Sequence, residues 1–257
     1  TGVRSRVVFA DGRSSISSYR EFPQHFPAPG LVEHDPLEIR DAVFATLGEV
    51  FGALGSTCID AIGITNQRET AVAWSRSSGL PLSRAIVWQD RRTADRCRDL
   101  EEQGALPLVR ATTGLVLDPY FSATKFEWLL RTTLPTPTTD LALGTVDSWL
   151  LWCLTGGRVH ATDPSNASRT MLYDINRGEW SGELCRLFGV PIEVLPTVRP
   201  SSGRFGSTAN VPGVPDGIPI SGIAGDQQAA LFGQACIVPG MAKNTYGTGS
   251  FVLMNVG

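Results

Sequence analysis

Apolar residues recur at helical spacing behind a helix-start signal near residue 35. Asp35, Pro36 and Glu38 are typical of a helix N-terminus, with Asp35 as the cap and Glu38 completing a capping box. One apolar face follows at spacings of three and four residues, made of Ile39, Val43, Leu47, Val50, Phe51 and Leu54. Similar patterns, several of them closed by glycine, predict helices over residues 93–103, 122–131, 146–154, 182–188 and 227–234.

Short apolar runs between these segments predict strands. Residues 7–9 and 16–22 form a predicted hairpin across Asp11-Gly12, which is a strong turn signal. Further strands are predicted over residues 58–64, 71–74, 85–88 and 218–224, with a final pair at 242–246 and 251–255. Hairpins mixed with crossover helices predict an α/β fold.

Composition places the chain among folded globular proteins. Its 257 residues suit one large or two modest domains, and 42% of them are hydrophobic. The net charge of −3 gives no basic field for nucleic acid or anionic lipid, and no leader or membrane span is visible. Five scattered cysteines favour a reducing compartment over a disulfide scaffold. We therefore expect a cytoplasmic protein with no nucleic-acid partner and no membrane insertion.

Asp226 is the first candidate for chemistry, because it stands where a predicted strand gives way to a helix. Aspartate is a preferred helix cap, so a purely structural role accounts for it. The carboxyl ends of strands in α/β sheets also face the ligand crevice, and a helix N-terminus favours negative charge. Asp226 is therefore a candidate general base as well as a candidate cap.

Gly247-Thr248-Gly249 joins the last two predicted strands. The backbone amides of such a turn, with the Thr248 hydroxyl, suit a phosphate group, although an ordinary hairpin turn explains the pattern equally well. The chain contains no G-x-x-x-x-G-K-[ST] run, and this turn lacks the downstream helix of a Rossmann loop. A P-loop enzyme and a dinucleotide-binding fold are therefore not indicated.

Six consecutive polar residues, Thr65–Thr70, separate two apolar strands without the glycine or proline that turns usually employ. A solvated turn explains them. Arg68 also offers several donors and Glu69 an acceptor, a pair suited to adjacent hydroxyls of a polyol. Trp88 at a strand end and Tyr120 beside a turn offer an aromatic wall and a hydroxyl, although core packing explains each of them alone.

Taken together, these segments resemble the glycerol kinase branch of the FGGY carbohydrate kinase family, in the actin/hexokinase/Hsp70-like ATPase superfamily. The Arg-Glu pair after Asn-Gln is typical of that branch. The matching runs occur in family order over nearly the whole chain: Gly63–Thr70, Ala85–Asp95, Thr113–Thr124, Gly144–Leu150, Asn166–Leu172, Ile218–Gly233 and Gly240–Gly249.

The resemblance implies a fold and an activity. Residues 1–234 would form the ribonuclease H-like, glycerol-binding N-terminal lobe, incomplete at its start, with a mixed sheet flanked by helices. Residues 235–257 would begin the nucleotide-binding C-terminal lobe with its first hairpin. The implied reaction is ATP-dependent phosphorylation of glycerol to sn-glycerol 3-phosphate, with Asp226 as general base. ATP, Mg²⁺ and a homo-oligomer, either dimer or tetramer, are implied as well.

The resemblance also implies site residues. Those matching the family's glycerol contacts are Arg68, Glu69, Trp88, Tyr120, Asp226, Gln227 and Phe251. Those matching its nucleotide-phosphate contacts are Thr1, Gly2, Arg4, Gly247, Thr248 and Gly249.

Two departures from the family pattern affect these expectations. The family's Asp-Gln-Gly-Thr run, whose aspartate helps hold the metal, is represented only from its threonine, Thr1. Mg²⁺ would then come with the nucleotide, with Asp226 as a candidate ligand. Most of the second lobe is missing, so we expect the isolated chain to be inactive.

Three other functions stay open at this point. The chain could act, within a kinase of the same family, on another polyol or a ketose, or it could bind a polyol without catalysis. It could also be a purely structural ATPase-like domain, for which the Arg68-Glu69 pair would be unnecessary. Phosphorylation rates across a polyol series separate the first of these from a glycerol kinase.

Overall fold

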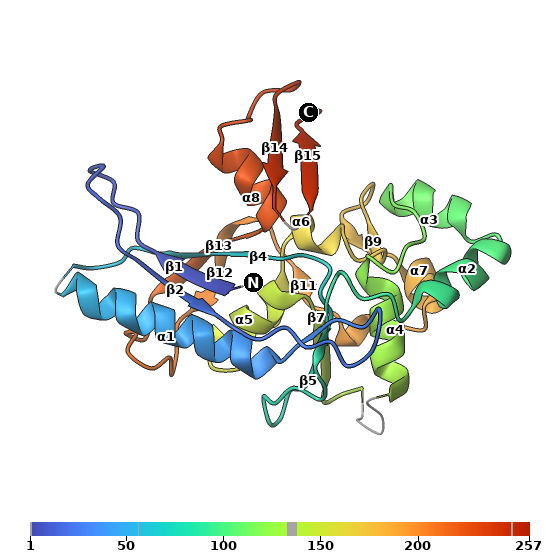
Figure 1. Ribbon diagram of the computed structural model, residues 1–257, viewed down its shortest axis with the longest axis horizontal. Coiled ribbons are helices and arrows are strands. Elements are labelled where there is room, and N and C mark those ends of the chain that lie inside the picture. Colours follow the sequence, from blue (N-terminus) through green and yellow to red (C-terminus); the bar gives the residue numbers. More distant parts are fainter. Residues whose placement is uncertain (1, 56, 133–137, 248) are drawn as a thin grey trace.

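The computed structural model describes residues 2–55, 57–132, 138–247 and 249–257. Its helices surround several small sheets (Figure 1). They are α1 (Pro36–Leu54), α2 (Ala94–Glu102), α3 (Leu106–Thr113), α4 (Ser122–Thr132), α5 (Val146–Leu154), α6 (Pro164–Ala167), α7 (Gly182–Leu187) and α8 (Asp226–Gly233), with a short 3₁₀ helix, η1 (Ile192–Val194).

The strands pair mostly as antiparallel ribbons, and the α/β class predicted from the sequence is confirmed. The antiparallel pairs are β1 (Gly2–Arg6) with β2 (Ser17–Glu21), β3 (Glu33–His34) with β6 (Ala85–Ile86), β5 (Val72–Ser75) with β7 (Leu141–Gly144), β9 (Tyr173–Asp174) with β10 (Glu179–Trp180), and β14 (Ala242–Tyr246) with β15 (Ser250–Met254). A parallel pair joins β8 (Ala161–Thr162) and β11 (Thr197–Val198).

One mixed three-stranded sheet sets the position of the candidate site. Its middle strand, β13 (Pro219–Gly225), runs antiparallel to β12 (Ser202–Ser207) and parallel to β4 (Ile62–Asn66). The pairing continues to the last residue of each parallel strand, where Gly225 lies opposite Asn66. Whatever follows these two strands therefore emerges side by side, at the edge where α/β sheets bind ligands.

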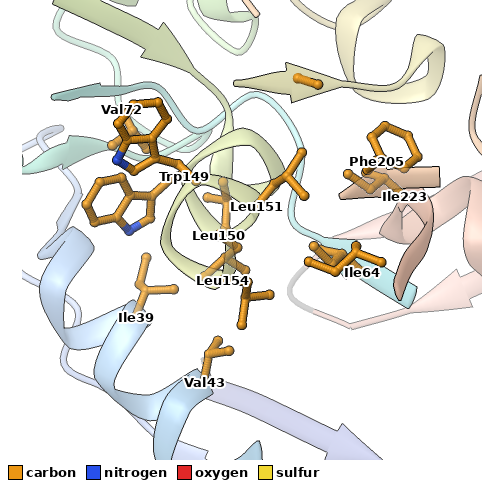
Figure 2. Packing of buried hydrophobic residues seen from close by; sticks show 14 of the residues in the cluster. Ile39, Val43, Ile64, Val72, Trp149, Leu150, Leu151, Leu154, Phe205 and Ile223 are labelled. Carbon is orange, nitrogen blue, oxygen red and sulfur yellow. The ribbon is translucent and has the colours of Figure 1, made fainter. Parts of the chain in front are cut away.

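A first hydrophobic core packs α1 and α5 against this sheet. Figure 2 shows Ile39 and Val43 of α1 facing Trp149 and Leu150 of α5, with Ile64 of β4 nearby. Trp149 is fully buried, and its indole Nε1 donates to the Pro36 carbonyl oxygen at 2.9 Å. That hydrogen bond satisfies the one polar atom of the largest side chain at the contact.

A second core lies on the other side of the β5–β7 ribbon. It gathers apolar residues of α4, α7 and the chain around them, including Phe126, Leu129 and Phe188, all of them buried. Because side chains on opposite faces of β5 enter different cores, the whole strand is buried, which explains its apolar run from Val72 to Trp74.

The predicted N-terminal strand was wrong in its boundaries. The strand covers Gly2–Arg6 rather than residues 7–9, and Val8 is 83% exposed. Polar residues can form this strand because Ser5 finds a partner inside, with its Oγ 2.8 Å from Thr46 Oγ1 of α1. The turn at Asp11-Gly12 is present, with Gly12 at a positive φ of 76°.

Two other local predictions need correction. The strand expected over residues 58–64 covers Ile62–Asn66, because β13 supplies hydrogen-bonding partners as far as Asn66, whereas Cys58 is exposed. Asp35 does cap α1 by accepting from the Leu37 amide. Glu38 does not complete a capping box, since its carboxylate contacts His25 Nε2 at 3.2 Å.

Helix α3 was not predicted from the sequence. Pro107 lies in its first turn and Gly114, at φ 70°, ends it, which is the pattern that favours a short helix. The final hairpin was predicted correctly as a strand pair. It projects with α8 from the rest of the molecule in Figure 1. Within the part of the chain that the structure describes, no helix combines the length and apolar character needed to cross a bilayer.

Buried His34 gives a prediction for stability. The ring is 0% exposed, and burial lowers its pKa from 6.5 to about 4. The unfolded chain therefore binds more protons between these pH values, and stability present above about pH 6.5 is lost as the pH falls through 4. The loss attributable to His34 is on the order of 3 kcal/mol.

Replacement of His34 by leucine is expected to flatten the acid limb of the stability curve. Urea unfolding at a series of pH values measures the slope. An unchanged slope in His34→Leu would contradict the assignment. Some slope should remain in that variant, because burial also lowers the pKa of His160 to about 4.

Candidate active site

The two loops that follow β4 and β13 bring the main candidate residues together. Arg68 and Glu69 come directly after β4, and Asp226 is the first residue of α8 after β13. The guanidinium Nε of Arg68 lies 3.4 Å from Asp226 Oδ1 and 3.7 Å from Glu69 Oε1. Two carboxylates and one guanidinium therefore share one small volume.

Arg68 is 6% exposed, and one of its side-chain donors has no hydrogen-bond partner among the described residues. Its Nη1 donates to Gln228 Oε1 at 3.1 Å. Its Nε is buried and, among the described residues, has no hydrogen-bond partner. A buried donor without a partner is costly, so a ligand oxygen at this position would restore a lost hydrogen bond.

Glu69 is held in an unusual conformation. Its φ is +61°, its backbone oxygen accepts from Ser122 Oγ of α4 at 3.0 Å, and its side chain is 2% exposed. Oε1 accepts from Arg169 Nε at 2.8 Å. Burial raises the pKa of this carboxyl, while Arg68, Arg169 and Lys125 oppose the rise. A non-glycine residue at positive φ persists only where surrounding contacts enforce it.

Asp226 is the more open of the two acids, with its side chain 45% exposed. Its Oδ1 accepts from the Gln227 amide at 2.8 Å, so it does not cap the helix from outside as the alternative interpretation required. Gln227 is 6% exposed and its Oε1 accepts from Lys243 Nζ of β14. This bond ties the final hairpin to the site, and Lys243 also donates to Thr245 Oγ1 of its own strand at 2.6 Å.

Three aromatic rings form a wall beside these polar groups. The ring of Trp88 stands edge-on to Tyr120 at 5.6 Å and to Phe251 of β15 at 6.3 Å. Gly249 is needed here, because a Cβ at that position would lie 2.7 Å from the Phe251 ring. The wall suits the carbon backbone of a small polyhydroxy ligand.

The residues expected to contact the ligand all line one cavity of about 1330 Å³: Arg68, Glu69, Trp88, Tyr120, Asp226, Gln227 and Phe251. Gly2, Arg4, Gly247 and Gly249 line it as well, whereas Thr1 and Thr248 lie outside the described residues. The cavity extends as an apolar groove past α1, where Val43, Leu47 and Val50 line it. At the other end of the cavity Arg68, Glu69 and Asp226 converge, and these supply the hydrogen-bonding groups that a triol needs.

The described residues contain no cluster of three or more His, Cys, Asp or Glu side chains that would hold a metal by itself. Mg²⁺ commonly keeps several waters and takes one or two carboxylates together with substrate phosphates. The half-exposed carboxylate of Asp226 fits that requirement, so a nucleotide-borne Mg²⁺ agrees with the residues present.

Sequence reasoning assigned no role to several residues around the site. Arg169, Lys125 and Lys243 contact or face the candidate residues from segments 16 to 100 residues away in sequence. Lys125 is fully buried, and its Nζ donates to the Pro119 and Tyr120 carbonyl oxygens. None of the three has a local sequence signature that points to the site, because their partners are distant in sequence.

Comparison with known proteins gives a consistent match. The N-terminal domain of the FGGY family of carbohydrate kinases matches residues 1–233. A glycerol kinase of Leptothrix cholodnii is 54% identical over 261 residues, which cover 99% of this chain and 52% of the relative. A glycerol kinase of Methylobacterium nodulans is 52% identical over 264 residues, covering 100% of this chain and 52% of the relative. The chain thus spans about half the length of the curated relatives it matches.

Solved structures agree on the fold. The crystal structure of Plasmodium falciparum glycerol kinase with ADP superposes with a TM-score of 0.88 at 37% identity, covering 93% of this chain and 49% of that one. A gluconate kinase from Lactobacillus acidophilus gives a TM-score of 0.89 at 19% identity, over 98% of this chain and 51% of its own. The second match bears on the fold alone.

Proposed function

Since the chain belongs to the FGGY family of carbohydrate kinases, we propose that it is the glycerol-binding half of a glycerol kinase, which transfers the γ-phosphoryl group of ATP to glycerol and gives sn-glycerol 3-phosphate. The observation that carries the proposal is the convergence of Arg68, Glu69 and Asp226 beside an aromatic wall. The similarity to glycerol kinases over the whole chain supports it.

Glycerol would bind at the polar end of the cavity. The Nε of Arg68, which has no hydrogen-bond partner among the described residues, donates to one hydroxyl oxygen, and the carboxylate of Glu69 accepts from a neighbouring hydroxyl. Tyr120 and Gln227 supply further polar contacts, while Trp88 and Phe251 cover the carbon atoms. Such a site rejects ligands that lack a hydroxyl, because its own buried groups would be left unpaired.

Asp226 would orient the hydroxyl that attacks phosphorus and accept its proton. Phosphoryl transfer depends on in-line positioning and on charge stabilisation more than on covalent catalysis, so the proton moves late. The Arg68 Nε, 3.4 Å from Asp226 Oδ1 and 3.7 Å from Glu69 Oε1, holds the Asp226 carboxylate near Glu69.

The nucleotide side of the cavity would be formed by Gly2, Arg4, Gly247 and Gly249, together with Thr1 and Thr248. ATP supplies the phosphoryl group, and its Mg²⁺ supplies charge neutralisation, with Asp226 as the carboxylate available to that ion. Backbone amides of the glycine turn and the Arg4 guanidinium are the groups of this chain that suit phosphate oxygens.

The chain divides, in this proposal, into residues 1–234 as the N-terminal lobe and 235–257 as the start of the C-terminal lobe. The family match ends at residue 233, which supports the boundary. Exposed apolar side chains also gather after it, among them Ile237, Val238, Val252 and Val256. We expect turnover to need the rest of that lobe as well as residues 1–257, and the homo-oligomer remains a prediction. The cytoplasmic location likewise remains a prediction.

Calorimetric titration with a series of polyols tests the proposed ligand. We expect glycerol to bind the chain, and 1,2-propanediol to bind at least about tenfold more weakly, because one buried group loses its partner. Arg68→Met should abolish the difference, while Arg96→Gln, which removes an arginine outside the cavity, should preserve it.

Other results point to the other functions. Tighter binding of xylitol or xylulose than of glycerol would favour a kinase for a longer substrate. Glycerol binding by a chimaera that completes the second lobe, with no ATP turnover, would favour a non-catalytic relative. Absence of any polyol binding would leave only a structural domain.

A further inference from the structure

Arg169 stands out among the residues to which the proposed mechanism gives no task. It lies in the turn after α6, and its side chain is 25% exposed. Its Nε donates to Glu69 Oε1 at 2.8 Å across 100 residues of sequence. Its guanidinium carbon also lies 4.9 Å from the centre of the Phe121 ring and 5.8 Å from that of Tyr120. One side chain therefore touches two residues of the proposed glycerol site.

A closed set of hydrogen bonds fixes Arg169 relative to Glu69. Ser122 Oγ donates to the Glu69 carbonyl oxygen, and the next amide, that of Ala123, donates to the Thr170 carbonyl oxygen at 2.8 Å. Thr170 is the neighbour of Arg169, whose guanidinium returns to the Glu69 carboxylate. The start of α4 thus holds both ends of the ion pair.

The turn that carries Arg169 is also anchored to the sheet. Asn166 of α6 is fully buried, and its Oδ1 accepts from Asn66 Nδ2 at the end of β4 at 2.9 Å. Asp163 caps α6 by accepting from the Ser165 and Asn166 amides. Glu69 follows the same strand end, so the backbones that carry Arg169 and Glu69 are both anchored at the end of β4. The distance between the two side chains is therefore tightly restricted.

The charges facing Glu69 show what Arg169 contributes. Arg68 approaches on the same loop, Lys125 faces it from α4, and Tyr120 lies beside it from the preceding loop. The Lys125 Nζ already donates to two carbonyl oxygens, and the Arg68 Nε lies 3.7 Å from Glu69 Oε1. Among the described residues Arg169 makes the direct hydrogen bond from a cation to this buried carboxylate, and such bonds are the strong ones.

We propose that Arg169 is a positioning residue for glycerol selection: it orients Glu69 and Tyr120 toward the ligand and keeps the Glu69 side chain in its hydrogen-bond-accepting form. The inference rests on the proposed function only in naming glycerol as the ligand. A protonated Glu69 would present a hydroxyl where the ligand hydroxyl needs an acceptor, so the charge of Glu69 and the choice of ligand are linked.

The test replaces Arg169 by glutamine and follows glycerol affinity from about pH 5 to about pH 9 by calorimetry. Burial already raises the pKa of Glu69, and loss of Arg169 raises it further. As the pH is lowered, the affinity of Arg169→Gln for glycerol should therefore begin to fall at a higher pH than the affinity of the unmodified chain. Near neutral pH we expect a loss of about tenfold to hundredfold, with partial recovery at alkaline pH.

Arg96→Gln is the matched control. Arg96 is 27% exposed and donates to Glu127, a buried acid outside the cavity, so the substitution removes a comparable ion pair. It should reduce stability without moving the pH profile of glycerol binding. Arg169→Lys keeps the charge, so its profile should lie between those of the unmodified chain and Arg169→Gln, and it decides the matter if the glutamine variant does not fold.

A second measurement separates failure of this inference from failure of the proposed function. Carboxyl ¹³C chemical shifts in chains labelled at glutamate, assigned with Glu69→Gln, report the titration of Glu69 without any ligand. An upward shift of its midpoint in the Arg169 variants supports the inference even if glycerol does not bind. An unchanged midpoint, or an equal change in Arg96→Gln, overturns it.

Discussion

Replacing Asp226 by asparagine is expected to lower glycerol phosphorylation by about 10²- to 10⁴-fold, the range lost with a general base. Asparagine has the same shape, and its Oδ1 can still accept from the Gln227 amide. It carries no negative charge and cannot take the proton of the attacking hydroxyl. Glycerol affinity should therefore stay within about tenfold of the original, since Arg68 and Glu69 remain in place.

Turnover is measured in a chimaera that joins residues 1–257 to the remaining half of a glycerol kinase relative, with ADP release as the readout. Affinity is measured on the chain itself by calorimetry. Asp140→Asn is the control, because it removes a carboxylate that bonds Ser75 and Ser77 away from the cavity. Weaker glycerol binding with unchanged turnover would refute the role of Asp226 as base.

Substituting Gly225 by alanine should have the second large effect, for a purely steric reason. The backbone of Gly225 is one that any residue can adopt, with φ −58° and ψ 149°. A Cβ there would lie 2.5 Å from Arg68 Cδ and 2.7 Å from Cγ. Arg68 is almost fully buried, so its side chain can relieve this clash only by moving away from Asp226 and Gln228.

We expect Gly225→Ala to weaken glycerol binding by about hundredfold and to cost about 1–3 kcal/mol of stability, as overpacking usually does. Calorimetry and urea unfolding provide the two values. Gly222→Ala, three residues earlier on β13, is the control, since its Cβ would find its nearest neighbour at 3.7 Å. Equal losses in the two variants would show that the contact with Arg68 is not the cause.

The position of the candidate site could be predicted in part from local sequence. Asp226 at a strand–helix junction and Arg68-Glu69 after a buried strand were recognisable, because strand ends and helix starts have local signatures. That both strands would lie in adjacent, parallel register was not local information. The pairing of Gly225 with Asn66 is what brings the two signals together.

Other parts of the site had no local signature at all. Glu69 adopts φ +61° because α4 and the turn after α6 hold it from two sides, whereas a sequence rule would reserve that conformation for glycine. Lys125 appears in the sequence as an ordinary polar position of α4. Only the packing of the Tyr120 segment over α4 buries it completely.

By itself the sequence determined the α/β class, helices α1, α4 and α5, the final hairpin and the family, because periodicity, capping residues and contiguous motifs are encoded over a few neighbouring residues. The tertiary structure alone decided the extent of β1 and β4, the ion pair of Glu69 with Arg169, and the contact of Gly225 with Arg68. These depend on partners distant in sequence, and such contacts form only once the chain has folded.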